Sequence, residues 1–182
     1  VQAFPEAFGA AKKNNIKLIP GCEGYLIDDS AIVVENSDNR VLDGISYVVL
    51  DVETTGLNKF TDMITEIGAV RIENGREVAE FSQLVNPGKP IPEKVVELTG
   101  ITDAMVRDKP TIDQVIGSFK EFCNGAVLVA HNASFDMAFF KRAFEESGLD
   151  FDYPMLDTLT LVRNQYPEFK SYKLGNMCKQ LG

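Results

Sequence analysis

The feature that most constrains the fold is a stretch near residue 50, where an apolar run leads into two acids and a glycine turn. Residues 47–50 are apolar or β-branched, which is typical of a buried β-strand. Asp51 and Glu53 follow, separated by one residue. Side chains alternate between the two faces of a strand, so both carboxylates are expected on the same face. The sequence Thr54-Thr55-Gly56 then predicts a tight turn that can bring backbone N–H groups close to a ligand.

Two carboxylates that converge on one side of a strand repel each other unless a cation lies between them. Hard divalent cations such as Mg²⁺ prefer oxygen ligands of this kind. An Asp-x-Glu pattern is common, however, and alone it does not define a metal site. A further acid, Asp136, follows the fully apolar residues 126–130 and lies near the start of an expected helix. The three acids Asp51, Glu53 and Asp136 therefore predict a carboxylate cluster. The alternative is that Asp136 only stabilises the N-terminus of its helix.

From residue 45 onward, the spacing of apolar residues predicts a regular succession of strands and helices. The first three strands are expected to form an antiparallel meander, with a hairpin turn at Glu73-Asn74-Gly75. The whole pattern predicts an α/β domain with a mixed five-stranded sheet and helices on both faces. The expected elements are strands at 47–51, 64–72 and 77–85, helices at 92–99 and 111–124, a strand at 126–130, a helix at 134–147, a strand at 155–157, and helices at 158–165 and 172–181.

Residues 1–44 differ from the remainder of the chain. They predict a helix over residues 3–15 and short strands at 16–19, 26–27 and 31–34. So few elements cannot bury an independent core. We therefore expect them to be a piece of a second, small α/β domain. The chain begins at Val1 rather than Met, which agrees with a piece of a longer protein.

Composition narrows the classes of function. The net charge of −9 argues against broad electrostatic binding to nucleic acid, although metal ions can offset the charge at a single site. No apolar run has the length of a membrane span, and no signal peptide is apparent. The three cysteines, Cys22, Cys123 and Cys178, fit neither a zinc spacing nor a disulfide framework. This pattern predicts a reducing, cytoplasmic setting.

Several segments resemble one family of nucleases. Residues 49–57 resemble the first motif of the DnaQ-like 3′→5′ exonucleases, which belong to the DEDD superfamily. The resemblance covers residues 47–182 and implies an RNase H-like fold. It also implies two divalent ions, Mg²⁺ or Mn²⁺, held by four carboxylates, and a histidine that activates the attacking water. Further similar segments occur in the family's order at 64–70, 98–102, 129–136, 157–159 and 171–174.

Carried over residue by residue, the resemblance implies that the catalytic residues and metal ligands are Asp51, Glu53 and Asp136. It implies contacts to the terminal nucleotide from Thr54, Thr55, Gly56, Leu57, Asn132 and Phe135. The family's third motif is absent from these 182 residues, because Tyr172 is followed by Asn176 where an acid is required. The only histidine, His131, is expected to be a hydrogen-bonded, positioned group rather than the base. A chain without the base and the fourth carboxylate is expected to be weak or inactive.

Residues 17–25 resemble a segment of the PHP (polymerase and histidinol phosphatase) domain, in which the residue matching Glu23 is a metal ligand. An ordinary loop acid is the alternative for Glu23. A PHP fragment at 1–44 followed by a DnaQ-like domain at 45–182 resembles the PolC-type replicative polymerases. This resemblance implies proofreading, with a single-stranded or frayed DNA 3′ end, the polymerase and PHP parts of the same chain, and a sliding clamp as partners. The alternatives are a DnaQ-like ribonuclease acting on short RNA and a non-catalytic DnaQ-like scaffold.

Overall fold

Contacts divide the chain into two units, Val1–Ser30 and Ala31–Gly182, which are described separately. In the first unit, helix α1 (Phe4–Lys13) forms where a helix was predicted. The strand predicted at residues 16–19 is wrong, because this segment has no strand structure. Glu23 and the strand predicted at 26–27 lie outside the described residues. The computed structural model describes residues 4–19, 32–37, 41 and 44–182.

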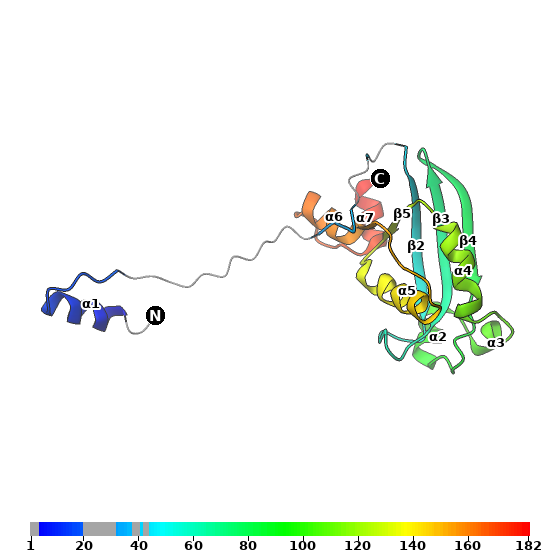
Figure 1. Ribbon diagram of the computed structural model, residues 1–182, viewed down its shortest axis with the longest axis horizontal. Helices are drawn as coiled ribbons and strands as arrows, with labels where there is room; N and C mark the ends of the chain where they lie inside the picture. Colours follow the sequence, from blue (N-terminus) through cyan, green and yellow to red (C-terminus); the bar gives the residue numbers. More distant parts are fainter. Residues whose placement is uncertain (1–3, 20–31, 38–40, 42–43) are drawn as a thin grey trace. The chain divides into compact units, whose positions relative to one another are not determined.

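The second unit is built on a mixed sheet with the strand order β1-β6-β5-β2-β3-β4 (Figure 1). Strands β2, β3 and β4 form the expected antiparallel meander, whereas β5 runs parallel to both β2 and β6. The prediction of a mixed sheet is confirmed, but within the described residues the sheet has six strands rather than five. The strands are β1 (Val34–Glu35), β2 (Ser46–Thr54), β3 (Ile64–Glu73), β4 (Arg76–Leu84), β5 (Val127–Ala130) and β6 (Met155–Asp157).

The additional strand, β1, comes from residues that the sequence pattern assigned to the N-terminal fragment. It pairs antiparallel with β6, placing Val34 opposite Leu156. The N–H of Asp157 extends this pairing by donating to the carbonyl of Val33 at 3.0 Å. Strand β1 therefore belongs with the sheet, although the expected boundary at residues 44 and 45 places it on the other side.

The turn between β3 and β4 confirms the hairpin prediction. Asn74 and Gly75 both have positive φ values, 50° and 72°, as a two-residue hairpin turn of this kind requires. Asparagine tolerates the left-handed region and glycine adopts it without steric cost. The turn fixes the register of β3 against β4 and so determines which side chains share a face.

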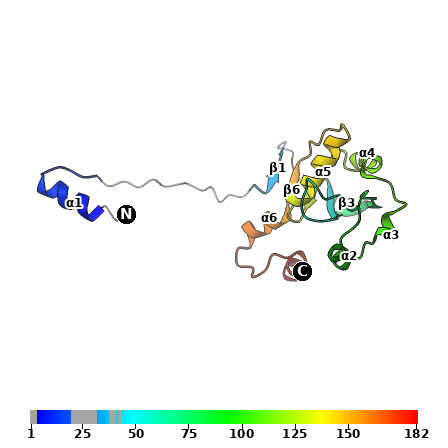
Figure 2. The ribbon, with the colours of Figure 1, turned by 90° about the horizontal axis from the view of Figure 1, so that it is seen from below.

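Helices cover both faces of the sheet, as predicted. In Figure 2, α4 and α5 lie on one side of the sheet and the C-terminal helix α7 lies on the other. Helix α3 was not predicted, because four residues are too few to show a helical period. No helix in the described part of the chain is long and apolar enough to cross a membrane. The helices of this unit are α2 (Glu93–Thr99), α3 (Asp103–Val106), α4 (Ile112–Phe122), α5 (Ser134–Glu146), α6 (Thr158–Gln165) and α7 (Leu174–Leu181).

The main core lies between the sheet and helices α4 and α5. Strand β2 contributes Val48, Leu50 and Val52, all of which are at least 95% buried. The rings of Phe119 from α4 and Phe140 from α5 stack above them, with centroids 4.6 Å apart and planes 8° from parallel. The alternate residues of β2 face the opposite side of the sheet. One face of β2 therefore contributes to the apolar core, and its other face carries Asp51 and Glu53.

Candidate active site

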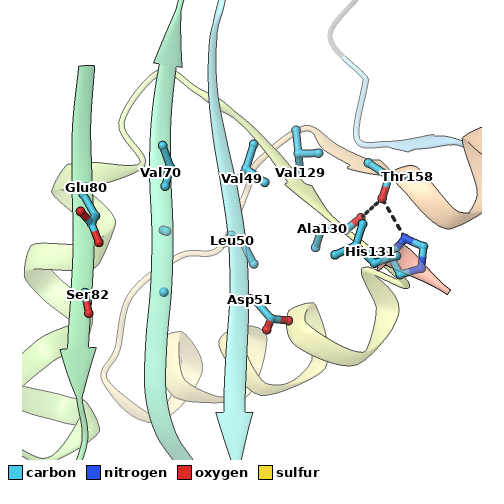
Figure 3. Close-up of a pocket in the computed structure, with 13 residues that line it drawn as sticks. Val49, Leu50, Asp51, Val70, Glu80, Ser82, Val129, Ala130, His131 and Thr158 are labelled. Carbon is cyan, nitrogen blue, oxygen red and sulfur yellow. Dashed lines mark hydrogen bonds between the residues drawn. The ribbon is translucent and has the colours of Figure 1, made fainter. Parts of the chain in front are cut away.

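The face of the sheet opposite the core is hollowed and open. A cavity of about 490 Å³ lies over strands β2 to β5, and its lining combines apolar residues with a few polar groups. Figure 3 shows Asp51 on β2 at one end of this surface, with Glu80 and Ser82 of β4 across the sheet. Side chains on this face include Val49, Val70 and Val129, together with Leu174 from α7.

Asp51 and Glu53 flank Val52, so the alternation of β2 directs both acids to the open face. Partial burial raises the pKa of Asp51, even though its side chain retains solvent contact. Burial, followed by the charges of Asp51 and Glu66, raises the pKa of Glu53. Glu66 lies opposite Glu53 in the β2–β3 register and was not among the predicted site residues. The alternation along β3 predicts that Glu66 shares a face with Gly68 and Val70. It does not predict which residue of the adjacent strand lies opposite Glu66.

Asp136 reaches the same segment of β2 from helix α5. Its side chain is only 2% exposed, and its Oδ1 accepts the N–H of Val52 at 3.1 Å. That N–H lies between the two acids of β2 and beyond the last residue of β2 that pairs with β5, which is Val49. Burial, followed by the charge of Asp51, raises the pKa of Asp136 to about 7. The structure thus brings Asp136 against the backbone between Asp51 and Glu53.

These acids offer oxygen ligands alone, which suits a hard divalent cation. The raised pKa values of Glu53 and Asp136 also reflect neighbouring negative charge that a cation would offset. As the side chains stand, no set of three His, Cys, Asp or Glu residues in the described ranges is arranged to hold a metal ion. Asp136 approaches from the core side of β2, whereas Asp51 and Glu53 lie on the open face. The donor chemistry therefore fits a metal, while a complete cage is not formed.

The predicted substrate-binding turn uses its hydroxyl groups internally. The Thr54 hydroxyl donates to the Gly56 carbonyl at 2.6 Å. The Thr55 hydroxyl donates to Asp62 Oδ1 at 3.3 Å, and Thr55 Oγ1 accepts the Met63 N–H at 3.1 Å. Both threonines are buried, whereas the Leu57 side chain is 85% exposed. The turn can therefore present its backbone and the Leu57 side chain to a ligand.

The turn between β5 and α5 contains the other two predicted substrate residues. Asn132 is exposed and has a φ of 65°, in the left-handed region. Its N–H donates to Asp157 Oδ1 at 2.9 Å. Phe135 is half-buried, with its ring 5.1 Å from that of Phe139. Asp157 was not predicted as a site residue, although an acid directly before an expected helix is a recognisable N-cap, and it does accept the Leu159 N–H.

His131 is held at both ring nitrogens. Its Nδ1 lies 3.1 Å from Thr158 Oγ1, and its Nε2 lies 3.0 Å from the Tyr172 carbonyl oxygen. A carbonyl only accepts hydrogen bonds, so Nε2 carries a proton and has no lone pair for a water. The arrangement agrees with a positioned group rather than a base. Asn176 donates to Ser171 Oγ at 2.9 Å and supplies no acid to the site.

Sequence comparison identifies relatives over the whole chain. A DNA polymerase III PolC-type from Clostridium perfringens (strain 13 / Type A) is 48% identical over 182 residues, which is 100% of this chain and 12% of the relative. One from Bacillus subtilis (strain 168) is 44% identical over 183 residues, covering 99% of this chain and 13% of the relative. The chain therefore spans about one eighth of the length of these curated relatives.

Solved structures and a family model agree with the fold. Exonuclease X in complex with 5′ overhanging duplex DNA is 32% identical, with a TM-score of 0.60, and the match covers 74% of this chain and 72% of that one. Product-bound exonuclease I, at 18% identity, has the same fold, with a TM-score of 0.67 and coverage of 75% and 38%. The family model described as Exonuclease matches residues 48–182. The fold is thus RNase H-like, and the chain belongs to this family as an exonuclease domain.

Proposed function

We propose that this chain is the proofreading 3′→5′ exonuclease domain of a PolC-type DNA polymerase III α subunit. The observation that carries the proposal is the hydrogen bond from the Val52 N–H to Asp136, which brings a third acid to the strand segment bearing Asp51 and Glu53. Similarity to PolC-type polymerases over the full chain supports the same assignment. The substrate is the 3′-terminal phosphodiester of DNA, and the reaction is its hydrolysis.

The proposed cofactors are two divalent ions, Mg²⁺ or Mn²⁺, with Asp51, Glu53 and Asp136 as their ligands in this chain. When bound, such ions lower the pKa of a water molecule and stabilise the attacking and leaving oxygens. The chain's own contribution is to fix the carboxylates. Strand β2 holds two of them on one face, and burial of Asp136 restricts its side chain to one position. Fixed charges of this kind need little rearrangement during the reaction.

The proposed substrate contacts are sequence-independent. The backbone of the turn at residues 54–57 would bind the terminal nucleotide, with Leu57, Asn132 and Phe135 beside its base and sugar. Apolar and aromatic contacts bind any base, because every base has a π-face. A frayed 3′ end of any sequence could therefore enter, which proofreading requires. The remaining parts of the proposal are a PHP fragment within residues 1–44 that excludes β1, Glu23 as its candidate metal ligand, polymerase and clamp partners, and a cytoplasmic location.

The test compares this chain with an extended chain. The extended chain continues past Gly182 with the segment that follows the aligned region in the Clostridium perfringens relative. We expect Mg²⁺- or Mn²⁺-dependent release of 3′-terminal nucleotides from a 5′-labelled single strand. The extended chain is expected to be about 10²–10⁴-fold faster, because it can supply the base and carboxylate of the missing motif. Equal rates for the two chains would contradict the role assigned to that motif.

The same assay separates the two alternatives. A ribonuclease would degrade an RNA 3′ end faster than a DNA 3′ end of equal sequence, whereas the proposal requires DNA to be preferred. A non-catalytic scaffold would show no metal-dependent cleavage. It would also give no heat of Mg²⁺ or Mn²⁺ binding when the extended chain is titrated calorimetrically. DNA cleavage together with metal binding supports the proofreading assignment.

A further inference from the structure

The segment after the substrate-binding turn is an exposed loop that makes several hydrogen bonds to side chains distant in sequence. We call residues 57–63 the 57–63 loop. Two of its three apolar side chains, Leu57 and Phe60, are 85% and 78% exposed and supply almost no packing, whereas the third, Met63, is half-buried. Besides its own backbone hydrogen bonds, the loop is held by charged side chains from three places in the chain. Two of these, Asp62 and Arg142, account for most of the contacts.

Asp62 ties the loop back to the turn. Its Oδ2 accepts the Asn58 N–H at 2.9 Å, and its Oδ1 accepts the Thr55 hydroxyl at 3.3 Å. The Lys89 ammonium lies 3.3 Å from Oδ1 and donates to the Thr61 carbonyl at 3.0 Å. A Cβ atom on Gly56 would lie 2.4 Å from Oδ2, so the carboxylate packs directly against the turn. Asp62 therefore joins the turn, the loop and the segment containing Lys89.

Arg142, which belongs to helix α5, also binds the backbone of the loop. Its Nη1 donates to the Lys59 carbonyl, and its Nη2 donates to the Asp62 carbonyl at 2.8 Å. Its guanidinium lies 5.9 Å from the centre of the Phe139 ring, and Glu146 lies 3.5 Å from its Nε. These contacts fix the side chain at its base while its outer nitrogens bind two carbonyls. A planar guanidinium with several donors suits such a double contact.

Helix α5 therefore binds the chain at two points, one in β2 and one in the 57–63 loop that follows it. Asp136, in its first turn, binds the Val52 N–H between the two acids. Arg142, farther along the same helix, binds the loop that follows Gly56. The helix is anchored in the core through Phe139 and Phe140. One rigid element thus relates the position of the turn to the position of the carboxylates.

We propose that Asp62 and Arg142 are positioning residues for the terminal nucleotide: they fix the Thr54–Leu57 turn at a set distance from Asp51 and Glu53. The proposal rests on the proposed function. Because Thr54 and Thr55 turn their hydroxyls inward, the ligand meets the backbone of the turn, and only a fixed backbone can place the scissile phosphodiester. A misplacement of about 1 Å can cost roughly 100-fold in rate.

The test replaces Arg142 in the extended chain with methionine, which keeps an unbranched apolar side chain but removes the guanidinium donors, and with lysine. Lys141→Met is the matched control. It removes a charge from the preceding residue of α5, whose ion pair is with Glu35 at 3.8 Å rather than with the loop. We expect R142M to raise KM for a single-stranded 3′ end about tenfold and to lower kcat about tenfold. R142K should fall between, because one ammonium cannot bind two carbonyls equally well.

The rise in KM distinguishes positioning from a purely structural role. Partial unfolding would lower kcat through the number of active molecules and leave KM unchanged. Hydrogen exchange gives a second measurement that needs no activity. In R142M and in Asp62→Ala, the amides of Asn58 and Met63 should exchange at least about tenfold faster, while those of Val48 and Leu50 in β2 should not change.

The outcomes separate this inference from the proposed function. A wild-type extended chain without metal-dependent cleavage would overturn the proposed function and, with it, the positioning roles. An active wild type in which R142M has the same KM and kcat as the Lys141→Met control would overturn the positioning roles alone. Faster exchange throughout the sheet of R142M would also overturn them, because it would indicate a general stabilising role. A raised KM with faster exchange confined to the 57–63 loop supports the assignment.

Discussion

Replacing Asp136 with asparagine is expected to lower metal-dependent cleavage by the extended chain about 1,000-fold or more. The amide can still accept the Val52 N–H, so the fold around residue 136 should be preserved. It cannot supply an anionic oxygen to a divalent ion. The charge stabilisation lost with one ligand corresponds to several kcal/mol, and about 4 kcal/mol is a factor of roughly 1,000 in rate. Initial rates on a 5′-labelled strand at saturating Mg²⁺ measure the loss.

The same substitution should stabilise the chain when no metal is present. Burial, with the charge of Asp51, raises the pKa of Asp136 to about 7, so the folded state binds this proton more tightly than the unfolded state. The free energy of unfolding therefore falls as pH rises from about 4 towards about 7 and stays low above that range. Asparagine carries no charge and avoids this loss. We expect D136N to be more stable than wild type by about 2 kcal/mol at pH 8 in EDTA.

Urea unfolding of the 182-residue chain at pH 5 and pH 8 checks this expectation. Asp152→Asn is the control, since residue 152 is exposed and its substitution should change stability by less than about 0.5 kcal/mol. Adding Mg²⁺ at pH 8 should stabilise wild type and leave D136N almost unchanged. A variant less stable than wild type at pH 8 without metal, or one that gains as much from Mg²⁺, would contradict the role of Asp136.

Replacing Phe119 with alanine is expected to cost about 3–5 kcal/mol of the free energy of unfolding. The Phe119 ring is completely buried, stacks on Phe140 and meets the edge of Phe81 at 5.4 Å between centroids. Its removal leaves a cavity between α4, α5 and the sheet that rigid neighbouring rings cannot fill. Because α5 also carries Asp136 and Arg142, we expect faster amide exchange in the 57–63 loop as well.

Chemical denaturation measures the first effect, and two variants serve as controls. Phe119→Leu retains most of the volume and should lose clearly less than the alanine variant. Phe60→Ala removes the same type of side chain from a site that is 78% exposed, so its cost should be below about 0.5 kcal/mol. Equal losses for Phe119→Ala and Phe60→Ala would contradict the assignment of Phe119 to the core.

The sequence correctly predicted those features that depend on residues close together in the chain. Alternation along β2 indicated that Asp51 and Glu53 share a face, and the Asn74-Gly75 turn indicated the β3–β4 hairpin. A strand was predicted at residues 31–34, which overlaps β1 only at Val34, but its place in this sheet could not be predicted because its partner β6 lies about 120 residues away. The strand predicted at residues 16–19 was wrong for a related reason. A strand needs a neighbour for its hydrogen bonds, and a short apolar run does not say whether one exists.

The site was only partly predictable for the same physical reason. The sequence supplied three acids, but the contact that brings Asp136 to Val52 joins residues 84 positions apart. Arg142 and Asp62 gave no signal at all, since an arginine on a helix and an acid in a loop are usually solvated. Their roles depend on which end of α5 lies beside the 57–63 loop. That relation follows from packing of the aromatic core and not from any local motif.

The alternation along β2 limits the changes of chain length that this domain can accept. Inserting or deleting one residue between Ser46 and Leu50 would rotate the residues on one side of the change to the opposite face of the sheet. Either the carboxylates of Asp51 and Glu53 would then be buried in the apolar core, or the valines of β2 that now lie in the core would be exposed to water. Insertions during divergence should therefore accumulate in exposed connections such as residues 107–109, where no side chain has to point to one particular face of a sheet.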